Sequence, residues 1–246
     1  KELSESYTFF APNYKHHPLV KNKIWDGKIR LYNYKNGQIY LGLVHDIKKK
    51  LRDMGYSVQD CTGEENDIEP EDIVQFCKDL MPTSDGKSIT HHDYQQAATF
   101  LAAKHKRRVI ISPTASGKSL IIYSIIRFLL NVIPGKILLL ESKINLTKQI
   151  LSDFEDYAEF QDFSPEEHCH RISAGIEKNS DKRVYISTFQ SIVKQDKDYF
   201  KQFDAIIIDE VHEAKSKSFI SILEQCVNAE YRIGLTGTLD GWEINE

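Results

Sequence analysis

The chain has 246 residues, of which 41% are hydrophobic and 28% charged, and its formal net charge is −4. These values are typical of a folded globular protein and exclude a disordered one, and no apolar run reaches the roughly 20 residues that span a bilayer. Four widely spaced cysteines form no CxxC pair, which excludes a zinc ribbon and is typical of free thiols in a reducing, cytoplasmic setting.

The first third of the chain predicts a small domain that contains both strands and helices. Strand-like runs over residues 28–34 and 38–42 flank Asn36-Gly37, a strong hairpin signal. Helices are predicted over residues 43–54 and 71–80. A turn-rich segment follows, and we place a boundary there, so that residues 1–85 form a small α+β domain and residues 86–246 form a second domain.

The charge of this first domain is divided into a basic half and an acidic half. Residues 14–52 contain ten Lys and Arg residues against two Asp, whereas residues 53–86 contain ten acidic residues against one Lys. Basic side chains interleaved with Tyr and Trp suit phosphate contacts and base stacking, so we predict a DNA-recognition surface here. A solvated basic face that the neighbouring acids balance is the alternative. The candidate DNA contacts are Lys28, Arg30, Lys48 and Lys49.

Residues 86–246 alternate strand-like apolar runs with helical patterns. The strands are predicted over residues 109–112, 136–140, 184–188, 205–208 and 232–235. Runs of Val, Ile and Leu without polar alternation indicate strands buried on both faces, and strand–helix alternation implies a parallel sheet covered by helices. The predicted fold class is therefore α/β, with a mainly parallel sheet flanked by helices.

A phosphate-binding loop is predicted over residues 112–119, Ser-Pro-Thr-Ala-Ser-Gly-Lys-Ser, between a predicted strand and a predicted helix. Its backbone N–H groups can wrap a phosphate, and the helix dipole favours the anion. We expect Lys118 to reach the β- and γ-phosphates of ATP and Ser119 to ligate Mg²⁺. An ordinary Ser/Gly turn is the alternative, and Ser112 stands where the usual pattern has Gly or Ala. The predicted cofactor-binding residues of this loop are Thr114, Ala115, Ser116, Gly117, Lys118 and Ser119.

Residues 205–212, Ala-Ile-Ile-Ile-Asp-Glu-Val-His, predict a hydrophobic strand that ends in two acids. Asp209 is placed to hold Mg²⁺ through water, beside Ser119 as the other metal ligand, and Glu210 is placed to orient or polarise the attacking water. Open α/β sheets bind ligands beyond the carboxyl ends of their strands, so the loop and the acids are predicted to meet in one crevice. Lys118, Asp209 and Glu210 are the predicted catalytic core.

In this order, residues 113–119, 209–212 and 236–238 resemble motifs I, II and III of superfamily 2 helicases. The resemblance implies that residues 86–246 form a RecA-like, P-loop ATP-binding lobe. Tyr94-Gln95 is similar to the upstream element of that superfamily that senses adenine, which implies that the Gln95 amide reads the adenine edge.

Further roles follow from the same resemblance. Residues 187–191 are similar to the motif that touches the nucleic-acid backbone, which implies DNA contacts from Thr188 and Gln190. The resemblance also implies a catalytic role for His212 and a relay from the γ-phosphate to the DNA surface. The relay residues would be His212, Thr236 and Thr238.

A closer resemblance covers nearly the whole chain. Residues 25–31, 41–44, 47–49 and 55–56 are similar to the N-terminal module of the UvsW-type family of recombination and repair helicases of T4-like phages. This resemblance implies ATP-dependent unwinding of branched DNA in recombination, repair and replication restart. It implies DNA as the partner, no membrane, and the cytoplasm of the host cell as the location.

Two features depart from that family. Residues 146–149, Leu-Thr-Lys-Gln, resemble motif Ia, and Glu141-Ser142 stands before it where the family tends to have Pro-Thr. The sequence ends at Glu246, soon after motif III, and contains nothing that resembles motifs IV to VI. We therefore expect a second RecA-like lobe in the same parent chain, carrying the arginine finger, and we expect this chain alone to bind nucleotide weakly and hydrolyse it little.

Three other functions share parts of this pattern. A restriction-type double-strand DNA translocase has motifs I to III and differs by tracking along duplex DNA without separating its strands. A regulatory DNA-binding module would keep a vestigial nucleotide site, which the presence of Lys118, Asp209 and Glu210 argues against. A P-loop kinase of small molecules rarely needs Gln95, the Asp-Glu-Val-His run and the Thr-Gly-Thr turn together.

Overall fold

The computed structural model of the chain describes residues 2–63, 65–113, 115–173, 175–213 and 217–237. The chain forms two compact units, Lys1–Thr62 and Gly63–Glu246. The boundary therefore falls earlier than residue 85, where the turn-rich sequence had placed it, and residues 63–85 belong to the second unit.

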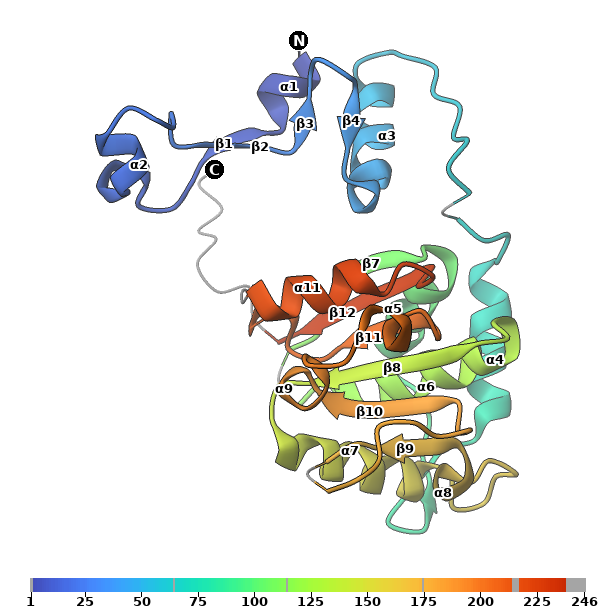
Figure 1. Cartoon of the computed structure of the whole chain (residues 1–246). Coiled ribbons are helices and arrows are strands. Elements are labelled where there is room, and N and C mark those ends of the chain that lie inside the picture. Colours follow the sequence, from blue (N-terminus) through green and yellow to red (C-terminus); the bar gives the residue numbers. More distant parts are fainter. Residues whose placement is uncertain (1, 64, 114, 174, 214–216, 238–246) are drawn as a thin grey trace. The chain divides into compact units, whose positions relative to one another are not determined.

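The first unit is built from short helices and two antiparallel strand pairs (Figure 1). β1 (Thr8–Phe10) pairs with β2 (Lys28–Arg30), and β3 (Tyr32–Asn33) pairs with β4 (Gln38–Ile39). Gly37 in the β3–β4 turn has φ +70°, which glycine adopts without strain, so the predicted hairpin is confirmed. The other elements are α1 (Glu2–Ser6), η1 (Tyr14–His16), α2 (Pro18–Lys21), η2 (Leu41–Leu43) and α3 (Val44–Asp53).

Six parallel strands form the centre of the second unit, in the order β7-β12-β11-β8-β10-β9 (Figure 1). The predicted parallel α/β sheet is therefore confirmed. β9 was missing from the prediction because its three residues, Cys-His-Arg, contain no apolar run. The strands are β7 (Arg107–Ile111), β8 (Lys136–Glu141), β9 (Cys169–Arg171), β10 (Val184–Thr188), β11 (Phe203–Ile208) and β12 (Tyr231–Thr236).

Helices cover both faces of this sheet, and alternate strand residues supply the two cores. Along β8, Ile137 and Leu139 pack with α6 and α7, whereas Leu138 and Leu140 pack with α9, α10 and α11. Successive strand side chains point to opposite faces, so only a continuous apolar run can fill both cores. The helices are α5 (Asp93–Lys104), α6 (Lys118–Val132), α7 (Ile144–Tyr157), α8 (Pro165–His168), α9 (Phe189–Ile192), α10 (Lys197–Phe200), η3 (Val211–Glu213) and α11 (Lys217–Gln225).

The helix α4 (Pro70–Leu80) explains why the segment before residue 85 belongs to the second unit. α4 buries Ile73 and Cys77 against Ala103 of α5. Phe76 packs edge-on against Phe128 of α6, with 5.9 Å between the ring centroids. Burying these apolar side chains stabilises the second unit, and α4 would expose them if it lay outside it.

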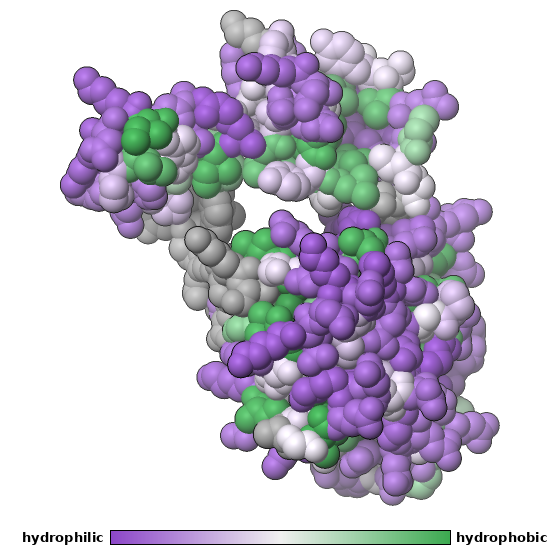
Figure 2. All heavy atoms as spheres, in the orientation of Figure 1, coloured by the Kyte–Doolittle hydropathy of each residue, from purple (hydrophilic) through white to green (hydrophobic). Residues whose placement is uncertain are grey.

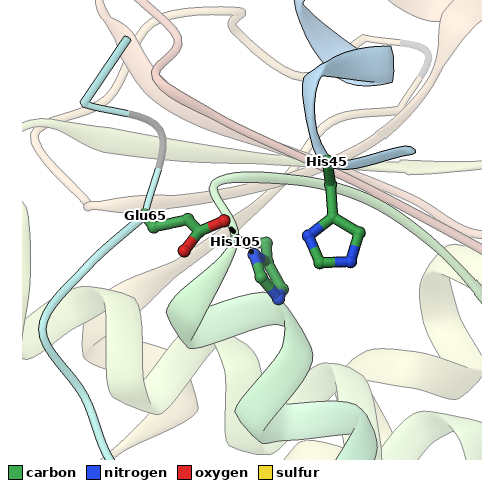
Figure 3. Close-up of side chains that lie close together, drawn as sticks. All are labelled: His45, Glu65 and His105. Carbon is green, nitrogen blue, oxygen red and sulfur yellow. Dashed lines mark ion pairs between the residues drawn. The ribbon is translucent and has the colours of Figure 1, made fainter. Parts of the chain in front are cut away.

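Polar contacts hold the segment before α4 on the same unit. Glu65 and His105 form an antiparallel bridge, and Nδ1 of His105 lies 3.7 Å from Oε1 of Glu65 (Figure 3). Nδ2 of Asn66 donates to the carbonyl oxygen of Ala103 and to the hydroxyl of Tyr231, each at 2.7 Å. These bonds connect the segment to α5 and to β12.

The turn-rich sequence that had suggested a linker forms a small hairpin within the second unit. β5 (Thr83–Ser84) pairs with β6 (Lys87–Ser88), and Asp85 and Gly86 between them both have positive φ. The backbone N–H of Asp85 donates to Oδ1 of Asp156 at 2.9 Å, which fixes the hairpin against the end of α7. Asp85-Gly86 thus predicts a tight turn, but turn residues of this kind do not indicate where a domain ends.

The surface of the second unit is mainly polar where it can be seen in Figure 2, in keeping with the concentration of its apolar residues in the two cores. Among the described residues, no helix combines the length and the apolar character that crossing a bilayer requires.

Candidate nucleotide-binding site

The predicted phosphate loop connects β7 to α6, and two of its described residues have left-handed backbone. Ala115 has φ +63° and Gly117, directly before α6, has φ +70°. The N–H of Ser112 donates to the carbonyl of Thr236 at 2.8 Å, and the hydroxyls of Ser112 and Ser116 lie 2.5 Å apart. Ser112, the departure from the usual loop pattern, therefore closes the loop with a hydrogen bond that Gly or Ala could not make.

Gln95, in the first turn of α5, is buried behind this loop. Its Nε2 donates to the carbonyl of Ser116 at 3.0 Å, and its Oε1 accepts from the N–H of His92 at 2.9 Å. A Cβ atom on Gly117 would lie 2.4 Å from Nε2 of Gln95 and would displace that amide, and the φ of +70° favours glycine independently. In this structure the side-chain amide of Gln95 therefore hydrogen-bonds to the phosphate loop. Its contact with adenine, which the resemblance implies, stays a prediction.

The two predicted acids lie at the carboxyl end of β11, facing the start of α6. The N–H of Asp209 donates to the carbonyl of Leu140 at 2.9 Å, which extends the β8–β11 ladder by one residue. Nζ of Lys118 lies 2.9 Å from Oδ1 of Asp209 and also pairs with Oε1 of Glu210. Two motifs far apart in the sequence therefore meet at one point, as the topology predicts.

A cavity of about 310 Å³ opens beside this meeting point. It is lined by the phosphate loop, by the ends of β8 and β11, and by one face of α7. The lining residues are Ala115, Gly117, Lys118, Ser119, Glu141, Leu146, Gln149, Ile150, Asp153 and Asp209. The cavity therefore presents an ammonium, a hydroxyl and three carboxylates, and hydroxyl and carboxylate oxygens are ligands that Mg²⁺ prefers.

Ser119, a predicted metal ligand, is engaged by α7. Its Oγ lies 2.9 Å from the hydroxyl of Tyr157 and also forms a side-chain hydrogen bond with Asp153. Asp153 and Tyr157 were not predicted as site residues. The signal for Asp153 lay in the helical spacing of the lining residues Leu146, Gln149, Ile150 and Asp153, which puts them on one face of α7.

Burial and mutual charge set the protonation of the acids. Burial, followed by the negative charge of Asp209, raises the pKa of Glu141 to about 8. Burial also raises the pKa of Asp209, although Lys118 acts in the opposite direction. Burial favours the neutral amine of Lys118, but its hydrogen bonds to Glu210 and Asp209 outweigh this effect and raise its pKa. Lys118 is therefore a persistent cation among acids.

The predicted relay residues adjoin the same acids. Nδ1 of His212 lies 2.7 Å from Oγ1 of Thr236 and 3.2 Å from Oε2 of Glu210. The N–H of Gly237 donates to the same Oε2 at 3.4 Å. A continuous set of polar contacts thus connects Lys118 to the carboxyl end of β12. Thr114 and Thr238, two other predicted site residues, lie outside the described residues.

The predicted DNA contacts of the second unit follow the end of β10. Thr188 is buried, and its Oγ1 lies 3.0 Å from Oγ of Ser191. Gln190 is exposed. Both residues stand at the carboxyl edge of the sheet, the edge that also carries the acids.

In the first unit, the predicted DNA contacts differ in their environments. Lys48 is only 7% exposed, and its Nζ pairs with Oδ2 of Asp60 at 2.8 Å, so its assignment as a phosphate contact is corrected to an internal ion pair. The physical reason is the amphipathic turn of α3, which puts Lys48 inside while Lys49 stays exposed. Arg30 pairs with Asp26, and Nζ of Lys28 lies 5.2 Å from the ring centroid of Phe10.

The parallel sheet, the loop between β7 and α6 and the acids after β11 define a RecA-like P-loop protein. The chain belongs to the family described as the res subunit of type III restriction enzymes, whose model matches residues 86–241. A second family model, described as the N-terminal part of the DNA helicase UvsW, matches residues 1–60.

Individual relatives extend this assignment. The chain is 34% identical over 250 residues to the ATP-dependent DNA helicase uvsW of Enterobacteria phage T4, a match that covers 99% of this chain and 49% of the relative. A crystal structure of the UvsW helicase from bacteriophage T4 matches with a TM-score of 0.80 and 34% identity, over 98% of this chain and 86% of that chain.

A more distant relative matches part of the chain. The DNA 3'-5' translocase XPB2 of Sulfurisphaera tokodaii is 30% identical over 150 residues, which is 61% of this chain and 31% of the relative. The chain thus spans about half the length of the phage T4 helicase and a smaller share of the translocase.

Proposed function

We propose that this chain is the nucleotide-binding part of an ATP-dependent DNA helicase that acts on branched DNA in recombination, repair and replication restart. The observation that carries the proposal is the meeting of Lys118 with Asp209 and Glu210 at a cavity lined by the phosphate loop. Likeness to the phage T4 helicase along nearly the whole chain supports DNA unwinding as the activity.

The residues of the cavity suggest how Mg-ATP is held. Loop amides and Lys118 bind the β- and γ-phosphates, for which Lys118 leaves its carboxylate partners, and Ser119 and Asp209 hold Mg²⁺. When bound, the ion neutralises charge on the phosphates. Glu210, freed from Lys118, orients the attacking water and accepts its proton. Positioning and charge neutralisation account for most of the catalysis in this class of reaction.

The polar contacts around Glu210 suggest how nucleotide state is communicated. We infer that His212 and Thr236, 2.7 Å apart, shift with Glu210 when the γ-phosphate is bound or released. Gln190, which is exposed at the same edge of the sheet, contacts the DNA backbone. The side-chain amide of Gln95 leaves the carbonyl of Ser116 and hydrogen-bonds to the edge of the adenine base instead.

A fluorescent ATP analogue tests the proposal directly. The chain is expected to bind it weakly but saturably, to lose it to unlabelled ATP, and to bind it more weakly when EDTA removes the divalent cation. The reason is that loop amides, Lys118 and the cation each neutralise phosphate charge. Fluorescence anisotropy measures the affinity, and absence of saturable, ATP-competed binding would contradict the proposal.

We propose that two basic residues of the first unit, the half-buried Lys28 and the exposed Lys49, contribute phosphate contacts. Replacing both Lys28 and Lys49 by alanine is expected to make the slope of log K against log salt shallower by about 2, because each phosphate contact contributes about 0.9. Titrations of labelled forked DNA at several salt concentrations give the slope. Lys87→Ala, an exposed lysine of β6, serves as the control, and an unchanged slope in the double variant removes both residues from the interface.

A duplex DNA translocase is the second candidate function. It is favoured by the family model of type III restriction enzymes and by the similarity to an archaeal DNA 3'-5' translocase. Strand separation distinguishes the two candidates. The whole parent protein displaces a labelled strand from a fork if it is a helicase, and displaces only a triplex-forming strand from duplex DNA if it is a translocase.

A further inference from the structure

Glu141, the last residue of β8, is a buried acid. Its exposure is 2%, and neither carboxyl oxygen has a hydrogen-bond partner in the part of the chain that the structure describes. It is also the only acidic residue among the buried residues of that part. Buried polar groups are nearly always hydrogen-bonded, so an exception of this kind points to a missing ligand or a chemical role.

The position of Glu141 places it at the candidate site. β8 lies between β11 and β10, and Asp209 follows β11 where Glu141 ends β8. Glu141 lines the cavity of about 310 Å³ together with Ser119 and Asp209, and a small hollow beside Phe189 together with Asp209. Glu141 therefore borders the space in which the proposed function places Mg²⁺.

The charges around the cavity are unbalanced. Lys118 is paired with Asp209 and Glu210, so its single positive charge is already opposed by two carboxylates. Glu141 and Asp153 add two further carboxyl groups to the cavity lining, and burial raises the pKa of both, so that each gives up its proton more readily once a cation faces it. If Lys118 turns to the phosphates of a bound nucleotide, the acids lose that cation, and a divalent ion is the group that compensates them.

A purely structural role does not account for this side chain. A buried acid that stabilised the fold would be expected to accept hydrogen bonds from backbone or side-chain donors, and Glu141 accepts none from the described residues. Its neighbours along the strand, Leu139 and Leu140, fill the cores with apolar side chains. An apolar residue would satisfy the packing at this position equally well.

We propose that Glu141 is a third carboxylate of the divalent-cation site, holding Mg²⁺ through the water shell of the ion together with Asp209 and Ser119. Mg²⁺ gives up its waters reluctantly and commonly keeps several of them when one or two carboxylates bind it. Residues that act through such waters orient the ion and contribute to its affinity. This inference rests on the proposed function, because the ion arrives with the nucleotide.

Binding of Mn²⁺ as a probe for the site tests the inference without measuring turnover. The intact chain is saturated with a non-hydrolysable ATP analogue, and free Mn²⁺ is followed by its electron paramagnetic resonance signal. The Kd for Mn²⁺ is expected to rise about 10-fold in Glu141→Gln, the size of effect seen when a residue outside the direct ligands is removed. Glu166→Gln, an exposed glutamate of α8, removes the same charge elsewhere and is expected to leave the Kd unchanged.

Glu141→Leu provides a second variant in case Glu141→Gln does not fold. Leucine removes the buried carboxyl group and suits the apolar strand, so the thermal unfolding midpoint is expected not to fall. Its Mn²⁺ affinity is expected to drop as in Glu141→Gln. Affinities within twofold of wild type in either folded variant overturn the role of Glu141.

The same experiment separates this inference from the proposed function. If the wild-type chain binds neither the analogue nor Mn²⁺ with it, the proposed function fails and the inference fails with it. If the wild-type chain binds both, and a folded Glu141 variant binds both equally well, only the inference about Glu141 is wrong.

Discussion

Replacing Lys118 by alanine is expected to weaken binding of a nucleoside triphosphate about 100-fold. Lys118 would donate charge-assisted hydrogen bonds to two phosphates, and bonds to charged groups contribute about 1.5–3 kcal/mol each. A loss of about 3 kcal/mol corresponds to roughly two orders of magnitude in Kd. The structure adds a second cause, because the variant would leave Asp209 and Glu210 without their cation and so repel the phosphates.

Competition against a fluorescent ATP analogue measures this effect. Lys87→Ala is the matched control, because it removes a lysine charge from an exposed strand of the same unit. The affinity of this control is expected to remain within twofold of wild type. If Lys118→Ala bound the analogue as tightly as wild type, the nucleotide would have to sit elsewhere, and the proposed site would be incorrect.

Replacing Arg183 by alanine is expected to lower the free energy of unfolding of the second unit by about 3 kcal/mol. The guanidinium donates from Nη1 to the carbonyl of Leu130 at 3.0 Å and from Nη2 to the carbonyls of Ile133 and Gly135. The last carbonyls of a helix have no partner within it, so Arg183 satisfies the end of α6 and also complements its dipole. Its loss leaves several partly buried carbonyls unbonded.

Urea unfolding followed by far-ultraviolet circular dichroism gives this free energy. Arg183→Lys keeps the positive charge but not the forked geometry, so it is expected to lose about half as much stability. A loss below about 1 kcal/mol in Arg183→Ala would mean that the carbonyls find other donors. α6 begins at Lys118, and Arg183 binds its other end. Arg183 therefore supports the nucleotide-binding site only by stabilising α6.

Much of the phosphate loop and the acid pair could be predicted because their signals are local. Gly117, Lys118 and Ser119 at a strand–helix junction, and Asp209-Glu210 after an apolar strand, need only chain order and the rule that parallel strands end at one edge. The hairpin at Gly37 is equally local, because positive φ is a property of a few consecutive residues.

Other features could not be predicted, because they depend on which distant segments pack together. The periodicity of α4 indicated a helix but not the helices that it covers, so the unit boundary was placed too late. Lys48 belongs to a basic run, and only the packing of α3 reveals that it faces Asp60. The contact of Ser119 with Tyr157 likewise depends on the way α7 lies against α6.

Glu141 illustrates the difference between what the sequence determines and what the tertiary structure determines. The sequence by itself determined the chemistry available at the sheet edge: a loop for phosphate, a lysine, a hydroxyl and two acids in series. The tertiary structure alone decided that Glu141 is buried beside them and finds no hydrogen-bond partner among the described residues. Residue type and spacing are encoded along the chain, whereas burial and pairing arise only when strands distant in sequence become neighbours in the sheet.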